Sequence, residues 1–390
     1  MSYTTHYIQN ERMNKRILID ATTVNITQPG GGSFCVQAYI EALLSLYPGQ
    51  IDILHPQEAH IRDERYNTID VPKRNTRQII KGMVKGQFHR GAEYILKHIE
   101  QHPNTYHTIV INTGLFAGSL INPLKQAALR IIVLHHNYEP EYRIASRSVL
   151  TLFGHTTALV KYWEKKGYLG ADINLFLTSS DCNTFECEYG KRENNHVIGI
   201  FEPTYQKQSL EHISPSKTAV ITCALGDKQN QNSLMQFIQC YMPTFSRLLP
   251  DWQVALMGRN PSEHLINIVQ QTPNMTIYPN PKDIRSLAAD CTIYLCPMDS
   301  GGGLKLRIMD GLRAGQPIIL HERSARGYEI LSNKSYFKTY NDINSFIEAI
   351  QAIHTYIASN ANSRQTIQEE YYTLFGLERG INHLKEILCK

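Results

Sequence analysis

The sequence has no long apolar segment and no large excess of charge of one sign. Its longest apolar runs, such as 131–134 and 219–221, are far shorter than the roughly 18 residues that span a membrane. The 39 Lys and Arg residues nearly balance the 35 Asp and Glu residues, which leaves a formal net charge of +4 over 390 residues. A nucleic-acid partner is therefore not expected, because nucleic-acid binding normally needs a strongly basic surface. Residues 1–16 also lack the apolar core of a secretory signal, so we expect a soluble, cytoplasmic protein.

The cysteines show no metal-binding or disulfide pattern. None of the eight belongs to a C-x-x-C pair, and most lie in apolar segments such as 292–296. Free, reduced thiols are the expected state. No Asp-x-Asp site is present either, and we expect neither a metal ion nor a bound cofactor.

Short apolar strands alternate with amphipathic helices along most of the chain. Candidate strands lie at 16–21, 50–54, 108–112, 128–134, 174–178, 196–201, 218–222, 253–257, 275–278, 292–296 and 317–320. Helical periodicity marks 36–47, 233–248 and the last residues from 343 onward. This alternation predicts parallel sheets that are covered on both faces by helices.

The expected architecture is α/β, with two doubly wound, Rossmann-like domains and a cleft between them. Residues 203–216 contain two prolines and no sustained period, which predicts a linker. We expect a disordered tail over 1–13, a first domain over 14–204, a second domain over 217–365 and a terminal helical segment over 366–390. Ligands of such sheets bind beyond the carboxyl ends of the strands, so chemistry is expected in the loops that follow strands.

Residues 71–92 have no acidic side chain. They contain six basic residues interleaved with apolar ones, and the basic residues are Lys73, Arg74, Arg77, Lys81, Lys85 and Arg90. One interpretation is a solvated helix face and loop. The other is a surface that contacts an anionic membrane or an anionic acceptor, which would place the protein at the inner face of the membrane.

Gly30, Gly31 and Gly32 follow the first strand and precede the first helix. Glycines allow backbone N–H groups to approach a ligand closely, and a helix N-terminus favours an anion. Asp52 lies 20 residues after Gly32, as a dinucleotide-binding motif requires, but the third glycine of that motif is missing. The loop is therefore interpreted either as a plain tight turn or as the lining of a sugar-phosphate or acceptor cleft.

His136 lies in the segment LHHNYEPEY, directly after the strand 128–134. An imidazole at the end of a strand has a pKa suited to hydrogen bonding with a sugar or to general acid–base catalysis. The alternative is a histidine whose hydrogen bonds are satisfied within its own loop. The spacing of the neighbouring polar residues gives only a weak indication of a metal site.

The segment PMDSGGGLKLRIMDGLRAGQPIIL, residues 297–320, is the most informative. A loop of three glycines, Gly301 to Gly303, predicts a helix start near Leu304, with Lys305 and Arg307 in its first turn. Basic side chains are normally unfavourable at that end of a helix, so an anion such as a diphosphate is expected there. Asp310 is either the partner of Arg307 in an i,i+3 ion pair or a carboxylate that binds the ribose hydroxyls of a nucleotide.

This segment resembles the C-terminal signature of retaining glycosyltransferases of the GT-B fold, particularly glycosyltransferase family 4. Further similar segments in the second half are 230–237, 249–252, 257–259, 274–275, 283–284 and 291–297. In the first half they are 30–32, 136–139 and 178–181. The resemblance implies that the first domain binds the acceptor, that the second binds a nucleotide-sugar and that the C-terminal helix crosses back onto the first.

The resemblance also implies roles for individual residues. Asp310 matches the second of two family glutamates, which binds ribose, whereas Gly302 stands where the first would be. The resemblance therefore places the donor sugar near the backbone of Gly301, Gly302, Gly303 and Leu304. The family's cations for the leaving diphosphate are matched by Lys228, with Lys305, Arg307 or Arg259 as substitutes. His136 is similar to the family's histidine near the donor sugar and acceptor, and Gly31 and Gly32 match its glycine loop.

The leading hypothesis is a metal-independent, retaining hexosyltransferase that uses a nucleoside-diphosphate sugar such as a UDP- or GDP-sugar. Its acceptor would be a glycan or a lipid-linked glycan, in the synthesis of a surface polysaccharide or glycolipid. Two alternatives remain open. One is a sugar-nucleotide epimerase of the same fold, and the other is a nucleotide-sugar-binding protein without catalytic activity, as Gly302 and the sparse cations of 223–230 would suggest.

Overall fold

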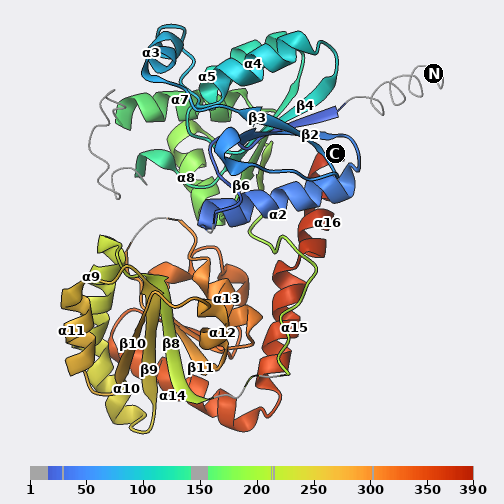
Figure 1. The fold of residues 1–390 in the computed structure, drawn as a ribbon. Coiled ribbons are helices and arrows are strands. Elements are labelled where there is room, and N and C mark those ends of the chain that lie inside the picture. Colours follow the sequence, from blue (N-terminus) through green and yellow to red (C-terminus); the bar gives the residue numbers. More distant parts are fainter. Residues whose placement is uncertain are drawn as a thin grey trace. The chain divides into compact units, whose positions relative to one another are not determined.

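A computed structural model describes residues 16–28, 30–141, 157–211, 213, 216–300 and 303–389. The chain divides into two compact units (Figure 1), one of residues 1–205 and 375–390 and the other of residues 206–374. Each unit has one parallel sheet with helices connecting its strands, which confirms the prediction of two Rossmann-like α/β halves. Residues 1–13, expected to form a disordered tail, lie outside the described residues.

The sheet of the first unit has seven strands in the order β3-β2-β1-β4-β5-β6-β7. They are β1 (Arg16–Asp20), β2 (Ile51–Pro56), β3 (Asn67–Val71), β4 (Tyr106–Ile111), β5 (Arg130–His135), β6 (Ile173–Phe176) and β7 (Asn195–Val197). All neighbouring strands run parallel. Asp52 is an internal residue of β2 and forms an ion pair with Arg16 at 2.6 Å, so this carboxylate stabilises the sheet.

Helices cover both faces of this sheet. They are α2 (Gly31–Leu46), α3 (Thr76–Val84), α4 (Ala92–Gln101), α5 (Gly118–Gln126), α7 (Thr157–Gly170), α8 (Ser179–Tyr189) and α16 (Leu377–Leu388), with the short 3₁₀ helix η1 (Gln57–Ala59). Buried side chains of α4 and α5, such as Ile95 and Leu120, form one core with those of the sheet. The terminal helix α16 packs against α2, and a Cβ at Gly380 would lie only 2.3 Å from the Phe201 ring.

The sheet of the second unit has six parallel strands in the order β10-β9-β8-β11-β12-β13. They are β8 (Ser216–Ala224), β9 (Gln253–Arg259), β10 (Met275–Pro279), β11 (Cys291–Cys296), β12 (Ile318–His321) and β13 (Phe337–Tyr340). The sequence pattern did not identify β3 and β13, which are edge strands of their sheets.

The helices of the second unit are α9 (Lys228–Gln236), the π-helical turn η2 (Phe237–Tyr241), α10 (Met242–Leu248), α11 (Glu263–Gln271), α12 (Ile284–Ala289), α13 (Arg307–Arg313), the 3₁₀ turns η3 (Glu322–Ala325) and η4 (Glu329–Leu331), α14 (Ile343–Ser359) and α15 (Ser363–Phe375). The helix expected over 233–248 begins at Lys228 instead. Asp227 caps it, because its side chain accepts a hydrogen bond from the Asn230 N–H. No helix in the described part of the chain is long and apolar enough to cross a membrane.

Candidate functional site

The second sheet reverses its strand order next to β8. β8 is the first strand of the unit and lies between β9 and β11. The strands β9 and β10 extend the sheet on one side of β8, and the strands from β11 to β13 extend it on the other. Ligands of open parallel sheets bind outside the carboxyl ends of the strands at such a switch point. The described segments that follow β8 and β11, residues 225–228, 297–300 and 303–306, therefore form the candidate site of this unit.

Hydrogen bonds anchor the start of the loop after β11. Ser233 of α9 donates from Oγ to Asp299 Oδ1 at 2.5 Å, and its Oγ lies 3.2 Å from that of Ser300. Ser324, from η3, donates to the carbonyl oxygen of Met298 at 2.6 Å. Sequence reasoning missed these contacts, although polar residues directly after a buried strand were a usable signal for Asp299.

Lys305 lies at the end of this loop with a partly buried side chain. Its Nζ atom donates to the carbonyl oxygen of Ser300 at 3.2 Å. Burial lowers the pKa of Lys305, Cys296 and Asp227 oppose this decrease, and the charge of Arg326 adds to it. A partly desolvated cation close to a second cation favours an anionic ligand.

The prediction that Lys305 belongs to the first turn of a helix is wrong. The helix α13 begins at Arg307. Before it, the carbonyl oxygen of Lys305 accepts a hydrogen bond from the Ile308 N–H at 3.1 Å. This i,i+3 bond is typical of the tighter turn that often precedes an α-helix, so Lys305 is positioned by the loop and by its own hydrogen bond to Ser300.

Arg307 is exposed, and its positive charge is felt by Cys223 near the carboxyl end of β8. Burial raises the pKa of the Cys223 thiol to about 12, and the positive charge of Arg307 opposes this increase. Cys223 lies at the end of β8 and Cys296 at the end of β11. The positive charges of Arg307 and Lys305 therefore act at the carboxyl ends of β8 and β11, the two strands that flank the switch point.

Asp310 is surrounded by three arginines. Its Oδ1 accepts a hydrogen bond from Arg313 Nη1 at 2.7 Å and lies 3.3 Å from Arg285 Nε. Its Oδ2 accepts from Arg307 Nη1 at 3.2 Å, so the i,i+3 ion pair considered from the sequence is present. A carboxylate has about four acceptor sites, and Asp310 retains capacity for a further donor such as a ribose hydroxyl.

The other predicted residues of this unit lie around the same edge. Lys228 is the exposed first residue of α9, and Arg259 is the exposed last residue of β9, paired in register with Ala224 of β8. Gly303 has a φ of 75°, a conformation that favours glycine, and Leu304 is partly buried. Gly301 and Gly302 lie outside the described residues.

The first sheet has its own switch point, where β1 lies between β2 and β4. Asn112 follows β4, and His136 follows β5. The His136 Nε2 atom lies 3.2 Å from the backbone oxygen of Asn112 and 3.3 Å from its Oδ1. Burial lowers the pKa of His136 to about 4, so the imidazole is neutral near pH 7. It is therefore suited to hydrogen bonding with a sugar, which is one of the roles considered from the sequence.

Two polar atoms at this switch point are buried without a hydrogen-bond partner among the described residues. They are Asn112 Nδ2, after β4, and Thr23 Oγ1, after β1. Leaving such a group unpaired costs about 1–3 kcal/mol, and a ligand with hydroxyl groups would remove that cost. Gly31 and Gly32 follow on the same connection after β1, where they are the exposed first residues of α2.

A buried carboxyl group holds the segment after His136. Glu164 of α7 is fully buried, and its Oε1 accepts a hydrogen bond from the Glu139 N–H at 3.0 Å. Its Oε2 accepts from the Tyr189 hydroxyl at 3.0 Å. Burial raises the pKa of Glu164 to about 8. This carboxyl group was not identified from the sequence.

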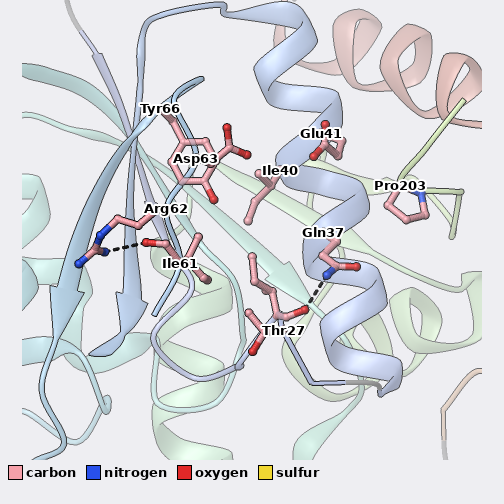
Figure 2. Close-up of a pocket in the computed structure, with 10 residues that line it drawn as sticks. Thr27, Gln37, Ile40, Glu41, Ile61, Arg62, Asp63, Tyr66 and Pro203 are labelled. Atoms are coloured by element: carbon pink, nitrogen blue, oxygen red, sulfur yellow. Dashed lines mark hydrogen bonds between the residues drawn. The ribbon is translucent and has the colours of Figure 1, made fainter. Parts of the chain in front are cut away.

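A pocket of about 350 Å³ lies beside α2 in the first unit. Figure 2 shows its side chains, which are Ile26, Thr27, Gln37, Ile40, Glu41, Ile61, Arg62, Asp63, Tyr66 and Pro203. Arg65 joins its two walls, because its guanidinium contacts Glu41 of α2 at 2.7 Å and Asp63 of the opposite loop at 2.7 Å. Gln37 donates to the carbonyl oxygen of Ile26 at 2.5 Å. The pocket thus combines aliphatic surface with acceptor oxygens whose charge is neutralised.

Within the described residues, no group of three or more His, Cys, Asp and Glu side chains is arranged to hold a metal ion. All eight cysteines are free.

Comparisons with known proteins identify the fold. No protein-family model matches the sequence, and no curated protein matches it either. Among solved structures, Anabaena HepE in complex with UDP-glucose is 13% identical, with a TM-score of 0.62 over 96% of this chain and 99% of that one. A glycosyltransferase from Rickettsia africae is 12% identical, with a TM-score of 0.62 over the same shares. The lipopolysaccharide outer core galactosyltransferase WaaB is 9% identical, with a TM-score of 0.63 and again 96% and 99% coverage.

At these identities the likeness establishes the fold alone. The chain has the GT-B architecture of these proteins, with two Rossmann-like α/β domains, as the resemblance had implied. Membership of glycosyltransferase family 4 and a retaining mechanism stay predictions.

Proposed function

We propose that this protein is a glycosyltransferase that transfers a sugar from a nucleoside-diphosphate sugar to a glycan or a lipid-linked glycan. The observation that carries the proposal is the pair of cations Lys305 and Arg307 on the segment that follows β11, at the switch point of the second sheet. The likeness to HepE extends over almost the whole of both chains, and the HepE structure contains UDP-glucose, which supports a nucleoside-diphosphate sugar as the donor. Synthesis of a surface polysaccharide or glycolipid is the process that we infer.

In this proposal Lys305 and Arg307 bind the diphosphate of the donor, and Arg259 and Lys228 extend the cationic edge. Gly303, whose φ of 75° favours glycine, supplies a backbone N–H group. Asp310 accepts a hydrogen bond from a ribose hydroxyl with its remaining acceptor capacity. The sugar leaves the diphosphate as positive charge develops at its anomeric carbon, and cations that stabilise the departing phosphate then supply the largest catalytic effect.

We place the acceptor on the first unit. The neutral His136, together with Asn112 Nδ2 and Thr23 Oγ1, offers hydrogen bonds to hydroxyl groups. The pocket beside α2 has an overall charge balance that favours a neutral, hydroxyl-rich ligand, since Arg65 compensates the carboxylates of Glu41 and Asp63. A retaining, metal-independent reaction follows from the resemblance to glycosyltransferase family 4.

The proposal is tested by donor screening and product analysis. UDP or GDP should raise the melting temperature of the purified protein in the presence of a chelator, and a radiolabelled donor should yield a labelled glycan or lipid. No melting shift with any nucleoside diphosphate would contradict the donor site. A changed sugar that remains free of any acceptor would indicate an epimerase, and binding without any turnover would indicate a non-catalytic nucleotide-sugar-binding protein.

A further inference from the structure

The helix α3 is attached to the first unit through one side only. Gly82 is its buried residue, and a Cβ there would lie 2.9 Å from Arg74 Nη1 and 3.2 Å from the backbone oxygen of Gln87. The segment after the helix is held by Phe88, whose ring packs 5.2 Å from that of Trp163 in α7. Figure 1 shows α3 at the periphery of this unit.

The opposite side of α3 combines apolar and basic side chains. Arg77, Ile80, Lys81 and Val84 are spaced i, i+3, i+4 and i+7, which places them on one face of a helix. All four are exposed, with 48% of Ile80 and 85% of Val84 accessible to solvent. A soluble helix normally turns such an aliphatic pair toward its own core, so this face is arranged for a contact outside the first unit's core.

The positive charge of this face is not neutralised within the unit. Arg90 forms an ion pair with Glu58 at 2.9 Å, but Arg77, Lys81 and Lys85 form no ion pair with any of the described residues. Residues 71–92 also contain no acidic side chain that could reach them from within the segment. The surface therefore presents three free cations around two aliphatic side chains.

We propose that α3 docks the protein on the surface of an anionic phospholipid membrane. The phosphates of the headgroups would pair with Arg77, Lys81 and Lys85, while Ile80 and Val84 enter the boundary between headgroups and acyl chains. A nucleic acid would pair with the cations but has no comparable use for Val84. The proposal does not depend on the donor site, which lies in the second unit.

Sedimentation of the full-length protein with lipid vesicles tests this docking. We expect the protein to pellet with vesicles that contain phosphatidylglycerol and to remain in solution with phosphatidylcholine alone. Each basic residue near an anionic surface increases binding about fivefold, so Arg77→Ser, Lys81→Ser and Lys85→Ser together should weaken it by on the order of 100-fold. Raised salt should weaken the wild type similarly, because exposed charges are screened.

Matched variants separate docking from a general charge effect. Lys97→Ser, Lys125→Ser and Lys191→Ser remove the same charge from exposed positions of the same unit, and this triple variant should pellet like the wild type. The pair Ile80→Ser and Val84→Ser keeps every charge and should still lose most binding. Loss of pelleting in the lysine control would overturn the proposal. Full pelleting of the Ile80→Ser and Val84→Ser variant would also overturn it, because a surface that needs only charge could equally bind an acidic protein. A melting temperature equal to that of the wild type, without any ligand, would show that each variant is folded.

Discussion

The Arg313 guanidinium donates from Nη1 to Asp310 Oδ1 at 2.7 Å, and both side chains are almost fully buried. Asp310 is therefore the electrostatic partner of a buried arginine as well as a candidate ribose ligand. The two roles predict different consequences of removing the carboxylate, and they are separable because only one of them involves the nucleotide.

Asp310→Asn should have two measurable effects. It breaks the buried ion pair between Asp310 and Arg313, and breaking such a pair typically lowers the free energy of unfolding by about 3 kcal/mol. It also removes a charged hydrogen-bond acceptor from the proposed ribose site, which should weaken UDP binding about tenfold or more. Urea denaturation measures the first effect, and isothermal titration calorimetry with UDP measures the second.

Arg285→Gln is the matched control for this change. Arg285 also approaches Asp310 Oδ1, at 3.3 Å, but its side chain is 60% exposed. Exposed ion pairs contribute roughly 0–1 kcal/mol, so stability and UDP affinity should both stay near those of the wild type. If Asp310→Asn lost stability but bound UDP normally, Asp310 would be a structural residue and the ribose assignment would be wrong.

Lys305→Met should reduce activity without reducing stability, whereas Asp310→Asn should reduce both stability and nucleotide binding. Methionine is unbranched and nearly as long as lysine. It removes the hydrogen bond to Ser300 together with a cation whose burial already lowers its pKa, and these effects oppose each other, so the folded protein should be about as stable as the wild type. The loss of a charge that stabilises a departing diphosphate should reduce the rate of sugar transfer by about 10²–10³-fold.

Lys282→Met is the control for that variant, because Lys282 is an exposed lysine of the same unit that lies away from the switch point, in the connection after β10. Its turnover of a radiolabelled donor should match the wild type. Equal rates for Lys305→Met and Lys282→Met would contradict the role given to Lys305.

The parts of the fold that the sequence did not predict share a physical cause. The strands β3 (NTIDV) and β13 (FKTY) each pair with one neighbour only and keep polar, partly exposed residues. The strands inside each sheet have the continuous apolar runs that parallel sheets require, and the pattern identified those. The edge strands β7 and β10 were identified as well, because 196–201 and 275–278 still contain several apolar residues. In β3 and β13 polar residues interrupt the apolar ones, and this removes the signal.

The candidate site was predicted where its residues are adjacent in sequence and missed where the fold brings distant ones together. Lys305, Arg307 and Asp310 lie within one segment, so their proximity follows from chain geometry. The contact between Ser233 and Asp299 joins residues 66 positions apart, and it depends on β8 and β11 being neighbours. The depressed pKa of His136 likewise arises from tertiary burial, which no local pattern reveals.

Glu164 should make the protein less stable as the pH rises. Its pKa is raised from 4.5 to about 8 in the folded state, so between these values the folded protein holds a proton that the unfolded chain has released. Glu164 by itself should therefore lower the free energy of unfolding by about 1.4 kcal/mol per pH unit across this window. Its effect is isolated above pH 6.5, where the buried histidines described below no longer differ in protonation between the folded and unfolded states. Urea denaturation at a series of pH values measures the slope.

Glu164→Gln should remove this component of the pH dependence, since glutamine resembles the protonated acid and does not titrate. Glu193→Gln, at an exposed position of the same unit, should leave the slope unchanged. A wild-type stability that stays constant from pH 6.5 to pH 8, with both variants parallel to it, would show that Glu164 is ionised in the folded protein.

His55, His135 and His136 should make the protein sensitive to acid. Burial lowers the pKa of each to about 4 from an ordinary value of 6.5, so between these values only the unfolded chain binds the protons. The sign is opposite to that for Glu164, and stability is lost as the pH falls below 6.5. Each histidine adds about 1.4 kcal/mol per pH unit to the slope.

His136→Asn should reduce the slope measured by denaturation, whereas His354→Gln, at an exposed position, should not. An unaltered slope in His136→Asn would contradict the burial of the His136 imidazole, because it would mean that this group has the same pKa in the folded and the unfolded protein.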